Sequence, residues 1–115
     1  MSRDCLFCRI AAKQIPADIV HEDDETIAFR DINPQAPTHL LIIPKEHIET
    51  LNDLEPSHDA LVGRLVLRAR ALAASEAVDE RGYRLVLNCL AEAGQSVYHV
   101  HLHLLGGRPM AWPPG

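Results

Sequence analysis

The chain lacks any apolar run that approaches the roughly 20 residues needed for a membrane-spanning helix. It also lacks the secretory signal pattern, in which basic N-terminal residues precede an apolar stretch. Basic residues are in the minority, with 11 Lys and Arg against 16 Asp and Glu and a net charge of −5. These absences argue against a membrane protein, a secreted protein and a protein that binds a nucleic-acid polymer, which needs a basic surface. We therefore expect a cytoplasmic protein, for which a small nucleotide is still an allowed ligand.

Cysteine is also scarce, with only three residues, Cys5, Cys8 and Cys89. An odd count in a reducing compartment favours free thiols or metal ligands over disulfides. The rest of the composition is that of an ordinary globular protein, with 47% hydrophobic and 23% charged residues over 115 positions. This length supports one hydrophobic core rather than two, so we predict a single domain over residues 1–115.

The order of the hydrophobic patterns predicts an α+β fold. We expect helices over 6–12 and 56–78, and strands over 18–21, 26–30, 38–43, 84–88 and 96–105. Strands that follow one another, rather than alternating with helices, favour an antiparallel sheet over a doubly wound parallel one. The prediction is a five-stranded antiparallel sheet with one long and one short helix, followed by an irregular tail over 106–115. We expect Trp112 in this tail to dock, because it carries a large apolar surface.

Three histidines recur at every second position near the C-terminus, at His99, His101 and His103. Side chains alternate between the two faces of a β-strand, so the three imidazoles would project from one face. The intervening apolar side chains would then point into a core: Val100, Leu102 and Leu104. Because histidines are costly to bury without partners, their concentration on one strand face indicates a chemical site.

Spacing alone leaves three interpretations of these histidines open: a nucleophile with supporting groups, a metal site, or a structural cluster. A neutral imidazole is a competent nucleophile near pH 7, since its unperturbed pKa is about 6.5. Histidines at this spacing also occur as zinc or iron ligands. His101 has a histidine two residues away on each side, which makes it the strongest candidate nucleophile.

A glycine-containing loop precedes the histidines and favours the first interpretation. In Gly94-Gln95-Ser96 the glycine permits close backbone approach, and successive N–H groups are able to cradle a phosphate. Ser96 adds a hydroxyl donor, and Asn88, at the end of the preceding expected strand, adds an amide. The sequence therefore predicts a phosphoryl-binding site beside His101 that is built without lysine.

Residues 94–104, which contain the loop and the three histidines, resemble the signature of the histidine triad nucleotide-binding family. The resemblance extends through 7–17, 27–34, 36–47 and 112–115, and so covers essentially the whole chain. The tail is similar to the purine nucleoside phosphoramidase branch rather than to the dinucleoside polyphosphate hydrolases. The resemblance implies a homodimer in which two five-stranded sheets join. It also implies hydrolysis of the P–N bond of adenosine or guanosine 5′-phosphoramidates and cleavage of aminoacyl-adenylate-type substrates.

The resemblance also implies roles for individual residues. His101 corresponds to the nucleophile that forms a nucleotidyl-histidine, His103 to the histidine that contacts phosphate and leaving group, and His39 to its relay partner. Asp31 corresponds to the carboxylate that holds the ribose hydroxyls. Trp112 resembles a tail residue that reaches the partner subunit's site. The apolar walls of the base pocket correspond to Phe7, Ile10, Phe29, Ile32 and Leu41, and the phosphate contacts to Asn88, Gly94, Gln95 and Ser96.

The Cys5-x-x-Cys8 pair, taken with His47 and His99, resembles the structural zinc site of many bacterial members of this family. Two thiolates and two imidazoles suit tetrahedral zinc, and His99 would then be a metal ligand rather than a catalytic group. A redox role for the pair is less favoured, because the motif does not follow a strand. No cofactor is expected for catalysis itself. We expect the remaining cysteine, Cys89, to pack as a small apolar residue.

Four functions are compatible with this pattern. The first is a phosphoramidase acting through covalent histidine catalysis, and the second is a dinucleoside polyphosphate hydrolase with a nucleotide phosphate as leaving group. The third is a nucleotide-binding regulatory module, and the fourth is a metal enzyme that uses all three histidines as ligands. The phosphoramidase is favoured by the tail with Trp112 and by the loop around Ser96. The sequence does not rank adenine over guanine.

Overall fold

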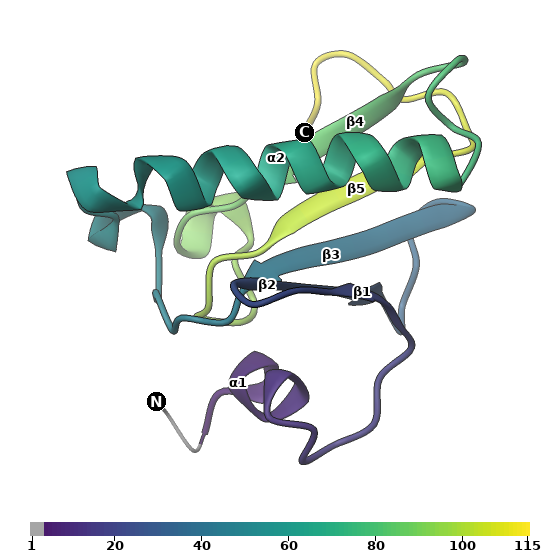
Figure 1. Ribbon diagram of the computed structural model, residues 1–115. Helices are drawn as coiled ribbons and strands as arrows, with labels where there is room; N and C mark the ends of the chain where they lie inside the picture. The colour runs from purple at the N-terminus through teal and green to yellow at the C-terminus, as the bar shows by residue number, and fades with distance from the viewer. Residues whose placement is uncertain (1–3) are drawn as a thin grey trace.

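The computed structural model describes residues 4–115, which form a five-stranded antiparallel sheet with a helix on each face (Figure 1). The sheet has the spatial order β1-β2-β3-β5-β4. Its strands are β1 (Ile19–Glu22), β2 (Thr26–Arg30), β3 (Thr38–Pro44), β4 (Tyr83–Leu87) and β5 (Leu102–Gly106). The helices are α1 (Leu6–Ala11) and α2 (Asp59–Ser75), and the 3₁₀ turns are η1 (Leu51–Asp53), η2 (Pro56–His58) and η3 (Ala91–Ala93). The predicted α+β class is confirmed.

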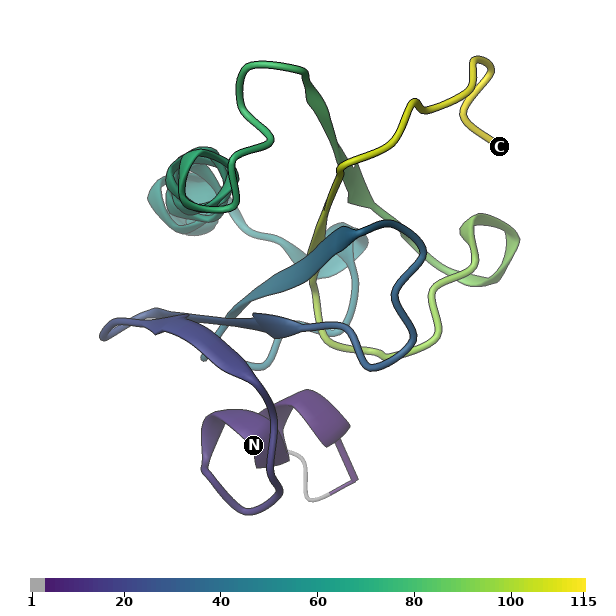
Figure 2. The same cartoon turned by 90° about the vertical axis from the view of Figure 1, so that its right-hand side faces the viewer.

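Helix α2 covers one face of the sheet, and Figure 2, which looks along α2, shows α1 on the other face. One side of α2 is apolar at helical spacing and buries Leu65, Ala69, Leu72 and Ala73. This side packs on alternate residues of the central strands, among them Leu40, Ile42, Leu102 and Leu104. The α2 layer therefore forms the main core and holds β3 and β5 side by side.

Helix α1 closes a second, smaller core on the opposite face. Its buried residues Phe7, Cys8 and Ile10 pack on the other alternation of β2 and β3. The strand residues of this core are Ile27, Phe29, Leu41 and Ile43. Because both faces of the central strands are covered, β2 and β3 are apolar at almost every position, as strands covered on both faces are expected to be.

The long helix is shorter than the predicted 56–78. It begins at Asp59, because η2 precedes it as a tight turn in which the backbone N–H of Glu55 donates to Nδ1 of His58 at 2.9 Å. It ends at Ser75, and two residues later Ala77 adopts φ 59, which is incompatible with a continuing right-handed helix. Sequence periodicity continues past both of these points, so it could not locate them.

The histidine segment is only partly a strand, which corrects the predicted strand over 96–105. Regular pairing in β5 begins at Leu102, which lies opposite Ile42 of β3 and Leu87 of β4. Strand β4 ends at Leu87, opposite this point, whereas before β5 the backbone N–H of Val100 donates to the carbonyl oxygen of Ile48, which follows β3, at 2.7 Å. The predicted alternation is nevertheless confirmed: the buried α2-side core includes Val100, Leu102 and Leu104.

The tail beyond β5 is irregular, as expected, and lies along β4. Its placement is supported by Arg84, whose Nη2 donates to the carbonyl oxygen of Ala111 at 2.9 Å. Trp112 is 83% exposed and does not dock on its own chain, so its expected docking stays a prediction for a partner surface. Within residues 4–115, no helix is long and apolar enough to cross a membrane.

Candidate active site

A cavity of about 220 Å³ lies on the α1 side of the sheet, with apolar walls and a polar margin. All five residues predicted for the base pocket line it: Phe7, Ile10, Phe29, Ile32 and Leu41. Ile32 belongs to the rim, since it is 97% exposed. The polar or charged lining residues are Arg30, Asp31, Ser96, His101 and His103. Such a site suits a ligand with a flat apolar part and a charged part.

The protonation of His101 follows from its contact with the backbone. Nδ1 of His101 lies 2.7 Å from the carbonyl oxygen of His99. A carbonyl only accepts hydrogen bonds, so Nδ1 carries the proton and Nε2 keeps its lone pair. Burial lowers the pKa of His101 below its usual value, opposed by the hydrogen bond to His99. His101 is therefore a neutral imidazole with a basic Nε2, as a nucleophile requires.

A second chain of hydrogen bonds sets the protonation of His39 and His103. The backbone N–H of Gln35 donates to Nδ1 of His39 at 3.0 Å, so the proton of His39 is on Nε2. That Nε2 lies 2.9 Å from Nδ1 of His103 and donates to it. The proton of His103 is consequently on its own Nε2, a buried atom with no hydrogen-bond partner within residues 4–115. The relay presents one N–H donor to a ligand.

Burial is the main reason why the pKa of His103 is lowered to about 4, and its neighbours His101 and His39 lower it further. Burial likewise lowers the pKa of His39, against the opposing attraction of Asp31. The pair is therefore uncharged at neutral pH in the free protein. A hydrogen bond between two neutral rings, rather than an attraction between charges, holds His39 and His103 together. This bond keeps each ring in one tautomer.

Asp31 follows directly after β2 and is held beside this pair. Its backbone N–H donates to the carbonyl oxygen of His39, and its Oδ1 accepts from the backbone N–H of Asn33 at 2.9 Å. Its Oδ2 lies 3.5 Å from Nε2 of His39. This carboxylate lines the cavity and has further acceptor capacity, which fits the role implied for it as a partner of ribose hydroxyls.

Asp31, His39 and His103 have side chains of the types that ligate metal ions, and their ligand atoms lie within 4.8 Å of one another. The geometry of the rings argues against a metal ion there. The ring centroids of His39 and His103 are 5.2 Å apart and the facing nitrogens 2.9 Å, so both nitrogens lie close to the line between the rings. The two nitrogens thus point at each other instead of converging on one point. This is the arrangement of a shared proton, and it disfavours the metal-enzyme alternative for the three histidines.

The predicted phosphate loop is only partly in the cavity wall. Ser96 lines the cavity, whereas Asn88, Gly94 and Gln95 are not among its lining residues. Gly94 has φ +85, a conformation in which a side chain would be strained. Gly94 and Gln95 precede Ser96 in this loop, and Asn88 lies earlier in the chain. Any contact of these three residues with a ligand is therefore outside the cavity itself.

Gln95 is buried and uses its side-chain amide to hold this loop. Its Oε1 accepts from the backbone N–H of Leu90 at 2.8 Å. Its Nε2 donates to the carbonyl oxygens of Glu49 at 2.7 Å and Val97 at 3.1 Å. With three hydrogen bonds made inside the protein, the Gln95 side chain supports the loop rather than facing a ligand.

His99 belongs to a separate cluster on the same face. Its Nε2 lies 2.7 Å from the carbonyl oxygen of Pro44 and donates to it, which leaves Nδ1 as a lone-pair nitrogen. That Nδ1 lies 3.3 Å from Nδ1 of His47, 3.3 Å from Sγ of Cys5 and 3.5 Å from Sγ of Cys8. Cys8 Sγ is also 3.2 Å from Nδ1 of His47. We refer to these four residues as the tetrad.

The tetrad fits a tetrahedral zinc ion. Ligand atoms about 2.0 to 2.3 Å from zinc lie about 3.3 to 3.8 Å from one another in a tetrahedron, which brackets most of these contacts. Helix α1 begins between the two cysteines: Cys5 caps it, with Sγ accepting from the backbone N–H of Cys8 at 3.3 Å. His47 follows the end of β3. The predicted ligand set is therefore brought together by three distant segments of the chain.

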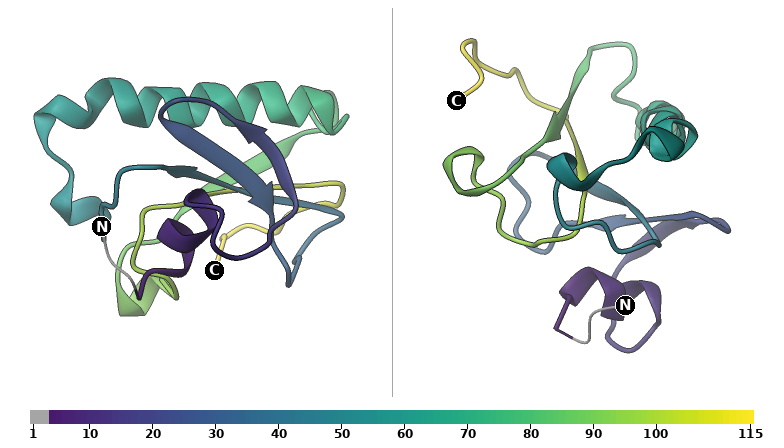
Figure 3. Two further views of the ribbon diagram at one scale, coloured as in Figure 1. Left: turned by 60° about the horizontal axis from the view of Figure 1, so that its bottom comes forward. Right: turned by 90° about the vertical axis from the view of Figure 1, so that its left-hand side faces the viewer.

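Helix α1 lies beside the chain that enters β5 (Figure 3). The Phe7 ring of this helix contacts two histidines of that segment. The ring is edge-on to His101, with centroids 5.1 Å apart, and edge-on to His99, with centroids 6.0 Å apart. It also packs on Phe29 of β2 at 5.4 Å. Phe7 thus belongs at once to the cavity wall and to the surroundings of both histidines.

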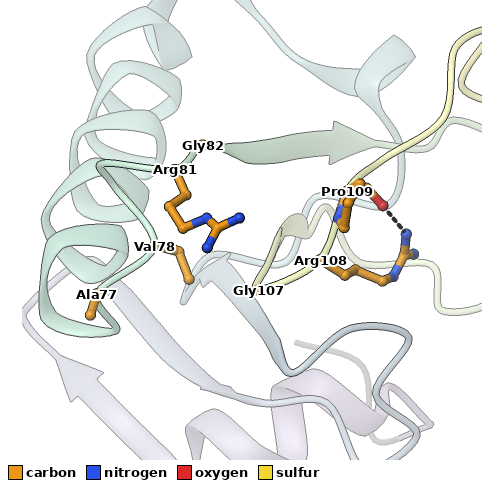
Figure 4. Close-up of a pocket in the computed structure, with 7 residues that line it drawn as sticks. All are labelled: Ala77, Val78, Arg81, Gly82, Gly107, Arg108 and Pro109. Carbon is orange, nitrogen blue, oxygen red and sulfur yellow. Dashed lines mark hydrogen bonds between the residues drawn. The ribbon is translucent and has the colours of Figure 1, made fainter.

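Another cavity, of about 340 Å³, lies between the end of α2 and the start of the tail (Figure 4). Arg81 and Arg108 line it, together with Ala77, Val78, Gly82, Gly107 and Pro109. Arg108 is already engaged with the carbonyl oxygens of Gln35 and Pro109. None of these lining residues is a histidine, cysteine or carboxylate, so the chemistry of hydrolysis is not located there.

The fold, the His39–His103 relay and the histidine segment entering β5 define a histidine triad protein. The chain belongs to the histidine triad (HIT) family of hydrolases. The model of the scavenger mRNA decapping enzyme C-terminal binding family matches residues 4–111. A HIT family hydrolase of Legionella pneumophila is 58% identical, with a TM-score of 0.96 over 97% of this chain and 100% of that one.

Two further relatives are known from sequence. The purine nucleoside phosphoramidase of Escherichia coli is 49% identical over 110 residues, which is 96% of this chain and 92% of that protein. A HIT-like protein of Synechococcus elongatus is 54% identical over 115 residues, the whole length of both chains. These similarities confirm the predicted family and the hydrolase class.

Sequence reasoning missed two sets of functional groups. The backbone groups that select the tautomers, the N–H of Gln35 and the carbonyls of Pro44 and His99, carry no signal in residue type. Further lining residues of the cavity are also ordinary in sequence: Leu6, Ile15, Pro16, Ala17 and Val97. These residues reach the cavity only because the tertiary fold brings their segments together around α1.

Proposed function

We propose that this protein is a purine nucleoside phosphoramidase that hydrolyses the P–N bond of adenosine and guanosine 5′-phosphoramidates and cleaves aminoacyl-adenylate-type substrates. The observation that carries the proposal is the tautomer of His101, whose Nδ1–H is taken by the carbonyl of His99. Its Nε2 is the unprotonated nitrogen of a residue that lines the cavity. The name of the Escherichia coli relative, at 49% identity, supports the same activity.

The apolar walls receive the purine, because a flat ring buries well against side chains such as Phe29 and Leu41. Asp31 accepts hydrogen bonds from the ribose hydroxyls. The phosphate then lies by Ser96 and the two histidines, His101 and His103, that border the cavity. Backbone N–H groups of the loop from Gly94 to Ser96 add donors for the phosphoryl oxygens. Asn88 supports this end of the site.

The reaction proceeds in two displacements at phosphorus. In the first, Nε2 of His101 attacks, the bond between phosphorus and the histidine forms, and the P–N bond to the amine breaks. The departing nitrogen accepts a hydrogen bond and then the proton of Nε2 of His103. The negative charge of the bound phosphate favours uptake of one proton from solvent by the His39–His103 pair, so that donation to the amine returns the pair to its neutral state. The amine leaves neutral, and the nucleotide is held as a nucleotidyl-histidine.

In the second displacement water attacks the same phosphorus. His103 takes a proton from the water, the bond to Nε2 of His101 breaks, and the nucleoside monophosphate is released. His101 returns as a neutral imidazole with its Nδ1–H still donated to His99. Proton donors and oriented backbone groups stabilise the phosphoryl oxygens in both steps, so no metal is required for the chemistry.

The tetrad of Cys5, Cys8, His47 and His99 holds zinc in this proposal. When bound, zinc supplies a rigid cross-link and takes no part in the reaction. It joins the start of α1 to the segments that follow β3 and precede β5. Thiolate ligands require reduced cysteines, which fits a cytoplasmic location.

The proposal includes a homodimer joined at β4. Strand β4 is at the edge of the sheet, paired on one side with β5, and within residues 4–115 its other side has no strand partner. An edge strand offers a row of backbone groups for pairing with a second copy. The tail lies along this strand through Arg84, which places the exposed Trp112 where it would meet the partner. Sedimentation is expected to give about twice the 12.8 kDa of one chain.

The test is hydrolysis of adenosine 5′-phosphoramidate at saturating substrate by the wild type and His101→Ala, each with and without a zinc chelator. His21→Ala is the matched control, since this histidine lies on β1 with Asp23 as its partner. We expect the wild type and His21→Ala to turn over the substrate both with and without the chelator. We expect His101→Ala to show no turnover in either condition. A rapid-quench experiment should trap the nucleotide on His101. Turnover by His101→Ala comparable to wild type would rule out the covalent mechanism.

A further inference from the structure

The tetrad is not sealed inside the protein. A cavity of about 330 Å³ is lined by two of its members, Cys5 and His47, whereas Cys8 and His99 do not line it and are almost fully buried. The other residues that line this cavity are Asp4, Leu6, Glu49, Ser96, Val97 and Tyr98. Carboxylate-bearing residues in a concave wall attract cations and raise their local concentration. The cavity therefore brings the tetrad within reach of a divalent cation at Cys5 and His47 while the protein stays folded.

The same cavity shares a wall with the proposed nucleotide site. Leu6, Ser96 and Val97 line both cavities. Leu6 is the first residue of α1, and Ser96 is the hydroxyl-bearing residue at the phosphate end of the loop. A shift of Leu6, Ser96 or Val97 therefore alters the nucleotide cavity and the cavity beside the tetrad together, because these residues line both.

The members of the tetrad also hold catalytic groups in place. His99 binds with its imidazole, while its backbone carbonyl takes the Nδ1–H of His101 at 2.7 Å. Phe7 lies between Cys5 and Cys8 in sequence, and its ring contacts both histidines. A metal ion that fixes the two cysteines and His99 thus fixes a wall of the cavity and the residue that selects the tautomer of His101.

We propose that the tetrad is an exchangeable zinc site whose occupancy is coupled to nucleotide binding in the adjacent cavity, so that zinc regulates the enzyme. The inference rests on the nucleotide site proposed above. Without zinc, the cysteines at the start of α1 meet His47 and His99 through thiol–imidazole contacts of 3.2 to 3.5 Å. Thiols are weak hydrogen-bond partners. The wall formed by α1 and Ser96 then has more freedom, and the nucleotide must order it on binding.

The coupling is reciprocal, because a nucleotide that prefers the zinc-bound form must raise the affinity for zinc by the same factor. We expect the Kd of adenosine monophosphate to be about tenfold larger after zinc is stripped by a chelator, within the range usual for coupled sites. The Kd of zinc, measured by competition with a chromophoric chelator, should be about tenfold smaller at saturating nucleotide. Calorimetry on the full chain measures the first quantity.

Equal nucleotide affinity with and without zinc would overturn the coupling while leaving the proposed function intact. Absence of nucleotide binding by the zinc-loaded protein would overturn both. Cys8→Ser should reproduce the stripped state, and Cys89→Ser, which alters a cysteine outside the tetrad, should behave as wild type. If Cys8→Ser does not fold, nucleotide affinity is compared between zinc-loaded and chelator-stripped wild type instead.

Exchange itself is tested by metal release. Zinc loss to excess chelator should be faster than global unfolding measured by hydrogen exchange in the same buffer. Cobalt(II) entering the stripped protein should produce a thiolate-to-metal absorption band. Glu49→Gln should slow this entry severalfold relative to Glu80→Gln, a matched change in the exposed turn after α2. Zinc release at the rate of global unfolding would overturn the exchangeable site.

Discussion

The backbone carbonyl of His99 accepts the Nδ1–H of His101 at 2.7 Å, while the imidazole of His99 points into the tetrad with the cysteines. Two residues that are almost adjacent in sequence therefore serve different sites, and one holds the tautomer of the other. The tautomer of His101 is therefore selected by the His99 backbone rather than by a neighbouring side chain.

The relay predicts that His39→Leu lowers kcat strongly while leaving the protein folded. Removal of the Nε2–H donor leaves Nδ1 of His103 without its partner, so His103 no longer holds its proton on Nε2 alone. We expect a loss of about 100-fold, typical of a misplaced general acid, and less than the loss in His101→Ala. Steady-state kinetics measures the loss, and ¹⁵N chemical shifts of His103 report a mixture of tautomers. A single unchanged tautomer would contradict the relay.

Stability is expected to fall as the pH falls from about 6.5 to about 4. The pKa of His103 is lowered to about 4 in the folded protein, mainly by burial, whereas it is about 6.5 when unfolded. Between these values the unfolded state binds more protons, so the free energy of unfolding decreases with decreasing pH. This histidine should contribute about 1.5 kcal/mol of that decrease between pH 6.5 and 5.

Urea denaturation of the wild type and His103→Gln at pH 6.5 and 5 measures this contribution. The difference between the two proteins isolates His103, since the other titrating groups are common to both. An equal pH dependence in the two proteins would show that His103 titrates normally in the folded state.

Gln95→Ala should destabilise the protein and impair phosphate binding. The change leaves the N–H of Leu90 and the carbonyls of Glu49 and Val97 without their partner. Unsatisfied buried polar groups predict a loss of about 1–3 kcal/mol in the free energy of unfolding. KM should rise more than kcat falls, because the loop is displaced and the histidines are not. Glu92→Ala, on the exposed turn η3 of the same loop, is the control and should differ little from wild type.

Gly106 at the end of β5 sets how closely the chain after α2 packs on the sheet. A Cβ added there would lie 2.9 Å from Cβ of Val78. Gly106→Ala should therefore destabilise by about 1–3 kcal/mol, the usual effect of overpacking. The double variant with Val78→Ala should recover part of this loss, which thermal or urea unfolding would detect. Simple additivity of the two changes would contradict the contact.

The alternation of histidine and apolar residues was sufficient to predict which side chains face the core and which face the site. Val100, Leu102 and Leu104 are buried under α2, because period-two alternation survives even where regular strand pairing has not begun. The α+β class followed in the same way from the succession of strands. The start of β5 was not predictable, since it depends on where the neighbouring strand β4 ends and on the contact of Val100 with the Ile48 carbonyl.

The family signature identified the candidate chemistry before any coordinates, because histidines, cysteines and the glycine loop occur at a specific spacing. Only the tertiary structure divided those histidines between two sites and assigned a proton to each nitrogen. The assignments depend on a backbone N–H at Gln35 and on carbonyls at Pro44 and His99. Every residue offers a backbone carbonyl and every residue except proline an N–H, so the sequence carries no record of which ones meet an imidazole. Chain geometry alone decides it.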